Sequence, residues 1–169
     1  MPAPQFSVNS YRFDPYRTFK FQLLIDGQVV AGVSKVSGLK TTVEVVDWRS
    51  AGDQSHKRKL VGGATYDPIT LEQGLSHDAI FQDWINLVNH IDGDASMSLL
   101  NFRKDIVINL LNLQGVPAMS YKVFRAWPSE FQALPDLDAG NTNTVGIQTL
   151  KLEIEGWRID DSVTEPAET

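Results

Sequence analysis

Residues 65–91 change their hydrophobic period once, and this change limits the folds that the chain can adopt. Ile69 and Leu71 alternate with polar residues, as in a strand buried on one face. Beyond Gly74 the apolar residues recur at helical spacing, which predicts one helix over residues 76–91. Its apolar stripe consists of Ile80, Trp84, Leu87, Val88 and Ile91. A single helix with such a stripe needs a sheet to cover.

The segments on either side of this unit have the alternation of strands. Residues 18–26 alternate cleanly and end at Asp26-Gly27, a dipeptide that favours a two-residue hairpin because it tolerates the positive φ of that turn. Further strands are predicted at residues 29–40, 41–49, 102–113, 119–126 and 144–159, the last being the longest. These strands supply the sheet that the helix requires.

Two stretches interrupt the strand pattern. Residues 50–63 are polar and rich in glycine, which predicts a loop long enough to bind a partner. Residues 127–139 contain prolines near both ends and predict a short helical or irregular crossover. The expected fold is α+β and mainly β, a small antiparallel β-barrel or sandwich of about seven strands with one principal helix packed outside.

The two ends of the chain differ from its middle. Residues 1–17 contain three prolines and predict an extended arm that is ordered only against a neighbour. Residues 160–169 are acidic and predict a flexible tail, which leaves residues 18–159 as one domain. No apolar run has the length of a signal peptide or a transmembrane helix, so we expect synthesis in the cytoplasm and export only by lysis or within a particle.

The composition removes several classes of function. The net charge of −6 disfavours nucleic acid and membrane surfaces as main partners, because both are anionic. The absence of cysteine excludes disulfides, thiol catalysis and Cys-ligated zinc. His56, His77 and His90 lack the spacing of metal ligands. With no phosphate-binding loop, nucleophile elbow or Ser/His/acid arrangement, the sequence predicts no enzyme, no cofactor and no metal site.

One carboxylate pair and the tryptophans need separate consideration. Glu153 and Glu155 on one strand face would lie about 7 Å apart, within the range of an inverting glycosidase. A solvated strand face is favoured, because Lys151 shares that face and no aromatic sugar platform accompanies the pair. The four tryptophans favour core packing over a ligand cage.

A basic run, residues 56–59, lies in the predicted loop. Such runs are usually only solvated. The alternative is a contact with acidic residues of another copy, for which Asp136, Asp138 and the acids of the tail are available. Both interpretations stay open.

Eight segments of the chain, spanning about residues 14–159, resemble a known family in sequence and in order. They are DPYRTFKF, IDGQVVAGVSKVSGL, TTVEVVDWRSAGD, YDPITLEQGLSHDAIFQDW, FRKDI, YKVFRAW, SEFQALPDLDA and LKLEIEGW. The chain resembles the tail tube proteins of contractile phages and, more closely, the inner-tube subunits of phage-tail-like contractile injection systems of bacteria.

The resemblance implies a structural subunit that forms hexameric rings, stacked into a hollow tube that sheath contraction drives through a target envelope. Its implied partners are further copies of itself, the sheath, baseplate and spike proteins, tube-terminating proteins and lumen cargo. The helix would lie outside, and the loop at residues 50–63 would reach neighbouring subunits. The candidate contact residues are Asp53, His56, Lys57, Arg58 and Lys59, and the candidates that line the lumen are Lys151, Glu153 and Glu155.

Three alternatives remain open at the level of sequence. The first is a paralogue that starts the tube at the baseplate, and the second is a hexameric ring carrier of the type VI kind. The third, from another class, is a monomeric β-barrel that binds or hydrolyses a small ligand with Glu153 and Glu155 at its mouth. The sequence also leaves open whether the source is a phage, a free particle or a membrane-anchored system.

Overall fold

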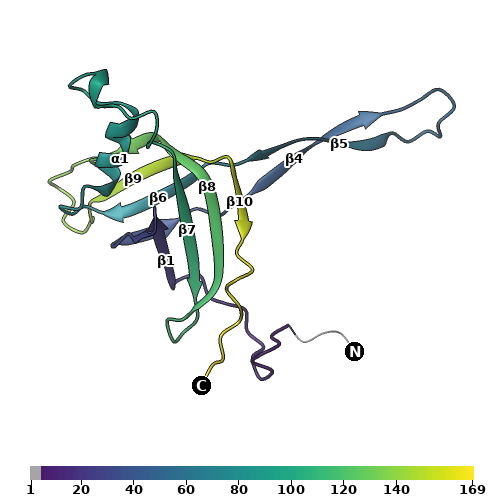
Figure 1. Ribbon diagram of the computed structural model, residues 1–169, viewed down its shortest axis with the longest axis horizontal. Helices are drawn as coiled ribbons and strands as arrows, with labels where there is room; N and C mark the ends of the chain where they lie inside the picture. Colours follow the sequence, from purple (N-terminus) through teal and green to yellow (C-terminus); the bar gives the residue numbers. More distant parts are fainter. Residues whose placement is uncertain (1–4) are drawn as a thin grey trace.

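The computed structural model describes residues 5–169, so the first four residues of the predicted arm lie outside the described chain. The described residues are mainly β, as the sequence predicts, with one α-helix and one short 3-10 helix (Figure 1). The elements are β1 (Phe21–Ile25), β2 (Gln28–Val29), β3 (Val33–Val36), β4 (Thr41–Trp48), β5 (Arg58–Tyr66), β6 (Ile69–Gly74), α1 (Ile80–Val88), η1 (Asp94–Ser96), β7 (Lys104–Leu111), β8 (Pro117–Gln132), β9 (Ile147–Glu153) and β10 (Gly156–Ile159).

Eight of these strands form one antiparallel sheet in the order β2-β1-β7-β8-β9-β6-β3, with β10 pairing β8 beside this path. Strands β4 and β5 pair only with each other and form a separate two-stranded sheet. Within residues 5–169 no pairing joins β2 to β3, so the large sheet keeps two free edges. The single chain is therefore an open antiparallel sheet rather than a closed barrel.

Strand β8 links the two halves of the large sheet. Its first part pairs with β7 and β10, and its second part pairs with β9. Between them Arg125 adopts a positive φ of 53°, and its backbone N–H donates to the Asp105 carboxylate at 3.0 Å. The register to β7 shifts at this point, as at a β-bulge that redirects a strand.

This strand corrects two sequence-based predictions. The crossover predicted at residues 127–139 is wrong over residues 127–132, because β8 runs through Pro128 to Gln132, whereas residues 133–139 are irregular. Pro128 is tolerated because it lies at a second register shift, where the ladder to β9 is irregular. The strand predicted over residues 144–159 is divided into β9 and β10, which makes β8 the longest strand.

Helix α1 covers the face of the sheet on which the core lies. Phe81 and Trp84 are its two buried residues, and the Trp84 indole N–H donates to the Phe102 carbonyl at 2.6 Å. Ile80 and Leu87 of the predicted stripe pack against the same core. The buried core comprises Leu23, Ile25, Val30, Ile69, Leu71, Phe81, Trp84, Ile106, Val123, Ala126, Leu150, Leu152 and Ile154.

The helix is shorter than residues 76–91 at both ends. Side chains compete with helix geometry at its start: Ser76 accepts the N–H of Asp78, and Asp78 accepts the N–H of Ile80. At the other end Asn89 is extended, so Ile91 lies beyond the helix and is 97% exposed. Ile91 is therefore not part of the core stripe, and Phe81 occupies a core position that the stripe did not include.

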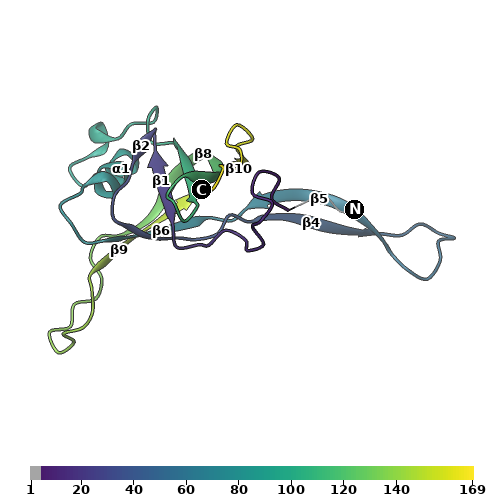
Figure 2. The ribbon, with the colours of Figure 1, turned by 90° about the horizontal axis from the view of Figure 1, so that it is seen from below.

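The loop predicted at residues 50–63 is in large part a hairpin arm. Strand β5 begins at Arg58, so only residues 49–57 connect it to β4. The β4–β5 hairpin extends far from the rest of the molecule in both views (Figures 1 and 2). The prediction failed because Gly62-Gly63 was interpreted as the end of a loop, whereas both glycines lie inside β5.

Candidate assembly surface

The β4–β5 hairpin carries apolar side chains that the single chain leaves in solvent. Every residue of β4 is exposed, and Trp48 and Val61 expose 47% and 87% of their surfaces. The large apolar side chains that it exposes are Val43, Val45, Val46, Trp48, Leu60 and Val61. An apolar patch of this kind on a soluble protein indicates an interaction site.

Both faces of the hairpin are apolar. Successive cross-strand pairs point to opposite faces, so the Val45–Val61 and Val46–Leu60 pairs lie on different sides of the ribbon. The Arg58 guanidinium lies 5.7 Å from the centre of the Trp48 ring, and this pair is on the same face as Val46 and Leu60. Isolated two-stranded hairpins are at best marginally stable in water. A ribbon that is apolar on both faces therefore needs a cover on each.

A β-bulge in the hairpin depends on one glycine. Val43 pairs with Ala64 and Val45 pairs with Val61, so Glu44 alone stands opposite Gly62 and Gly63. A Cβ at Gly62 would lie 2.9 Å from the Glu44 carbonyl oxygen, closer than real Cβ atoms come, whereas one at Gly63 would meet nothing within 4 Å. The two glycines are thus inequivalent: Gly62 permits the close approach of the strands.

Some of the predicted contact residues already have partners within their own chain, and others do not. The Asp53 carboxylate accepts the backbone N–H of Ser50 at 2.9 Å and a guanidinium N–H of Arg58 at 2.8 Å. The Ser50 hydrogen bond is the main reason that the pKa of Asp53 lies below its usual value. Lys59 pairs across the strands with Asp47 at 3.4 Å. Within residues 5–169 neither His56 nor Lys57 has an ion-pair partner.

The structure gives the two residues of the predicted carboxylate pair different surroundings. Glu153 ends β9 and accepts a hydrogen bond from the Ser129 hydroxyl at 3.4 Å. Glu155 lies in the bend before β10, where its carboxylate pairs with Arg125 at 3.0 Å and Arg103 at 3.6 Å. Glu155 therefore lies outside β9, so the two carboxylates do not share the single strand on which the sequence places them.

A groove of about 620 Å³ lies beside the root of the hairpin. Its lining includes Ser37, Gly38 and Leu39, which come just before β4, and it is largely apolar. The apolar and aromatic part of its lining is Phe21, Val36, Leu39, Ile108, Leu110, Tyr121, Trp157 and Ile159. The groove therefore offers an apolar surface on which another segment could pack.

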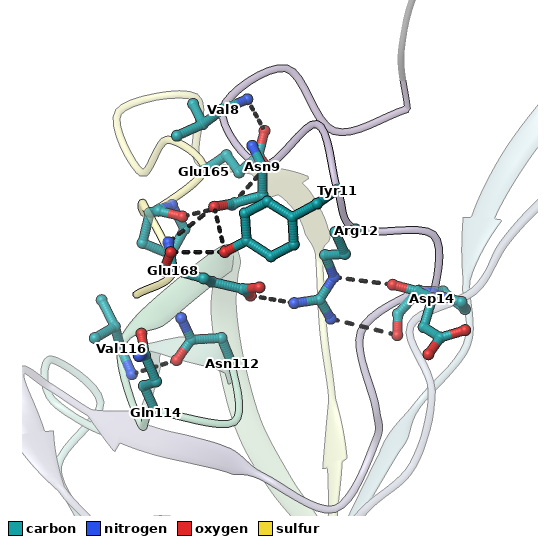
Figure 3. A network of polar contacts seen from close by, with 12 residues as sticks. Val8, Asn9, Tyr11, Arg12, Asp14, Asn112, Gln114, Val116, Glu165 and Glu168 are labelled. Carbon is teal, nitrogen blue, oxygen red and sulfur yellow. Dashed lines mark hydrogen bonds and ion pairs between the residues drawn. The ribbon is translucent and has the colours of Figure 1, made fainter.

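The N- and C-terminal segments of the described chain hold each other (Figure 3). The Glu165 carboxylate accepts the backbone N–H groups of Val8 and Asn9, each at 3.0 Å. Asn9 is buried, and its amide donates to Glu165 and to the Pro166 carbonyl oxygen, each at 2.8 Å. The Val8 N–H makes the largest contribution to holding the pKa of Glu165 below its ordinary value of 4.5.

A second set of contacts adjoins this one. Arg12 pairs with Glu168, and its guanidinium lies 5.0 and 4.3 Å from the ring centres of Phe6 and Tyr16. We call residues 6–16 together with residues 165–168 the terminal clasp. The division into arm, domain and tail stays a prediction, but the described parts of the arm and tail contact each other in a single chain.

The tryptophans separate the covered and uncovered parts of the molecule. Trp84 is buried, Trp127 and Trp157 are half-buried, and Trp48 is exposed.

Among residues 5–169 no three His, Asp or Glu side chains gather closely enough to hold a metal ion. In the same part of the chain, no helix has both the length and the apolar character to cross a membrane.

A comparison of the sequence with protein-family models identifies the family of this chain. The T4-like virus tail tube protein gp19 family matches residues 17–158. The chain belongs to this family. The match confirms the resemblance to tail tube proteins that the sequence segments indicate. The chain is therefore a structural, tube-type subunit of a contractile tail or contractile injection system. No curated protein matches the tail tube chain in sequence.

Solved structures share the fold of this tail tube protein. A chain in the cryo-EM structure of the anti-feeding prophage (AFP) tube-terminating cap has a TM-score of 0.73 at 23% identity, over 88% of this chain and 93% of that one. A chain of the PVC extracellular contractile injection system sheath-tube complex in the extended state has a TM-score of 0.71 at 23% identity, and the match covers 86% of this chain and 91% of that one. A chain of the 6-fold symmetrised AFP baseplate has a TM-score of 0.71 at 24% identity, and the match covers 88% of this chain and 97% of that one.

Proposed function

We propose that the protein is the inner-tube subunit of a contractile injection system or phage tail, and that its hexameric rings stack head to tail around a hollow lumen. The observation that carries this proposal is the β4–β5 hairpin, a two-stranded ribbon with exposed apolar side chains on both faces. Burying these side chains between other copies would gain roughly 25 cal/mol for each Å² of apolar surface removed from water. The hairpin is therefore an assembly arm.

The open edges of the large sheet support lateral association. Strands β2 and β3 end the sheet, and an exposed edge presents unpaired backbone groups to any neighbouring strand. A ring in which such edges meet copies of the chain would extend the sheet around a central channel and leave fewer free edges. The hairpin would then reach across the boundary between copies.

The alternation of β9 supports a polar channel. Leu150 and Leu152 point into the core that α1 covers, so Lys151 and Glu153 point to the opposite side of the sheet. If the helix lies outside the ring, that opposite side faces the lumen. We propose Lys151, Glu153 and Glu155 as residues that line the lumen, the last of them already paired with Arg103 and Arg125.

The names of the similar structures suggest the partners and the place of assembly. Those structures are a sheath-tube complex, a baseplate and a tube-terminating cap. By extension we propose a sheath, a baseplate with its spike and a terminating protein as partners of this chain, which would be made in the cytoplasm and then built into the particle. We propose no enzymatic activity, with residues 18–159 as the tube domain.

One alternative is favoured by a specific observation. The AFP baseplate chain matches this chain with the same TM-score as the PVC sheath-tube chain, which supports a paralogue that starts the tube at the baseplate equally well on fold. The two roles differ in what the purified protein does. A tube subunit adds ring upon ring, whereas an initiator stops at one ring.

Negative-stain electron microscopy of the purified chain tests the proposal. We expect rings and stacked tubes in wild-type protein, and their loss when a short turn replaces residues 43–64. Single rings without stacks at any concentration would favour the baseplate initiator. A wild-type protein that stays monomeric in sedimentation velocity at every concentration would contradict both roles.

A further inference from the structure

Two segments project from opposite ends of the molecule (Figure 2). One is the hairpin tip, residues 49–57, which joins β4 to β5. The other is the β8–β9 loop, residues 133–146, which is drawn in yellow-green and extends on the side away from the hairpin. Neither segment contributes a residue to the buried core or to the residues packed against it, so each has surface available for contact with another molecule.

The hairpin tip carries positive charge that its own chain does not neutralise. Arg58 pairs with Asp53 and Lys59 pairs with Asp47, so half of the basic run is compensated inside the hairpin. In the described chain Lys57 and Arg49 form no ion pair with an acidic side chain, and Arg49 donates only to a backbone carbonyl, that of Asp53.

The acidic tail is a poor partner for this charge. Glu165 accepts hydrogen bonds from residues 7–9, and Glu168 pairs with Arg12. Asp160 pairs with Lys122 at 3.1 Å and accepts the hydroxyl and backbone N–H of Ser162. Three of the four carboxylates in residues 160–168 are therefore engaged within the chain, which leaves Asp161.

The β8–β9 loop offers two carboxylates without such partners. Asp136 and Asp138 form no ion pair within residues 5–169, although Asp138 accepts the backbone N–H of Gly140 at 2.9 Å. The two residues line a shallow cavity of about 300 Å³ together with Leu137, which is 75% exposed, and Val145. The loop thus combines negative charge with apolar surface, as the hairpin tip and the neighbouring Trp48 combine positive charge with apolar surface.

We propose that the hairpin tip of one copy binds the β8–β9 loop of a second copy, with Lys57 and Arg49 paired to Asp136 and Asp138. This inference rests on the proposed tube assembly and names the surface that its hairpin meets. The two patches are different and lie at opposite ends of the molecule, and in the proposed stacked tube their contact is heterologous, repeating from copy to copy. Each copy therefore donates its tip in one direction and receives a tip from the other.

Reciprocal charge reversal tests the contact. One variant carries Arg49→Glu and Lys57→Glu, a second carries Asp136→Lys and Asp138→Lys, and a third combines all four substitutions. We expect each reversal to raise the protein concentration needed for assembly about tenfold, since like charges in contact oppose association, and the combination to restore it. Assembly is measured by sedimentation velocity and negative-stain microscopy.

The control is Asp161→Lys, which changes an exposed tail acid without touching the proposed contact. Unchanged circular dichroism and thermal unfolding of all variants exclude a folding defect. If wild-type protein assembles and neither reversal alters it, the inference is wrong while the proposed function stands. If each reversal disrupts assembly but their combination does not restore it, the pairing of these two segments is likewise wrong. A wild type that never assembles contradicts the proposed function itself.

Discussion

Strand β6 and the β4–β5 hairpin are adjacent in the chain and built from the same kind of residues, yet their surroundings differ completely. Ile69 and Leu71 of β6 are 0% exposed beneath α1 and beside β9, whereas Val61 of β5 is 87% exposed. Strand β6 has the alternation of a strand buried on one face, whereas the hairpin carries apolar side chains on both faces. Apolar side chains on a strand therefore predict that it will be covered. The same chain covers β6, and we propose that other copies cover the hairpin.

The largest test of this comparison replaces one tryptophan in each region. Trp84→Ala removes a buried ring and its hydrogen bond to Phe102, so we expect a loss of roughly 3–5 kcal/mol in the free energy of unfolding. Trp48→Ala should change the unfolding of the monomer by less than about 0.5 kcal/mol and weaken assembly instead. Urea unfolding below the assembly concentration measures the first effect, and sedimentation velocity the second. Equal losses of monomer stability would break the comparison.

Alanine substitutions at the two neighbouring glycines of β5 test the bulge within the hairpin. Gly62→Ala forces a Cβ against the Glu44 carbonyl, so we expect the hairpin to lose about 1–3 kcal/mol of local stability, as overpacked sites do. Gly63→Ala has open space and serves as the matched control. Hydrogen exchange of the β4–β5 amides should rise only in the first variant, with the protection of β6 unchanged. Similar exchange in both variants would contradict the assigned bulge.

A third pair of substitutions, one in the core and one in the hairpin, keeps the shape of the side chain and changes only its polarity. Val123→Thr places a hydroxyl in the core and should cost about 1–3 kcal/mol of monomer stability. Val61→Thr, on the exposed ribbon, should leave the monomer unchanged and raise the concentration needed for assembly. Thermal unfolding and light scattering separate the two effects. A Val61→Thr monomer as unstable as the Val123→Thr one would place the hairpin inside the cooperative core.

The terminal clasp lies between these extremes, because polar contacts hold it. The folded-state pKa of Glu165 is depressed, so the clasp gains full stability above the ordinary pKa of 4.5 and loses it as the pH falls through the folded-state value. We expect the hydrogen-exchange protection factors of residues 7–9, which allow for the change of intrinsic exchange with pH, to fall below pH 4.5, and Glu165→Gln to lower them already at pH 7. Asp161→Asn is the control. Protection that is independent of both changes would contradict the role of Glu165.

Hydrophobic periodicity in the sequence was sufficient to predict the elements whose packing partners lie within the same chain. It placed β6 and the centre of α1, because their partners lie within the chain and impose strict burial. It failed where a breaker residue is accommodated by irregular pairing: Pro128 lies within β8 and Gly62 within β5, each at a register shift that no local pattern reveals.

The sequence drew attention to the hairpin through its basic run and not through its apolar residues. That the run contacts another copy stays a prediction, and within the chain Arg58 and Lys59 pair with Asp53 and Asp47. The exposed apolar residues were missed because tryptophan is usually buried, and Trp48 was predicted to be core. A signal was present, since TTVEVVDW places apolar residues on both faces of a strand that has only one neighbour. Which copy covers a face is a property of the assembly, so no local pattern encodes it.

Strand β8 has a mechanical consequence. It passes unbroken from the turn after β7, through the corner at Arg125, to its ladder with β9. A load applied at one end of the subunit therefore travels along covalent bonds and is shared out sideways over many hydrogen bonds in shear. If the subunit is driven forward within the proposed tube, β8 would keep the two halves of the sheet in register.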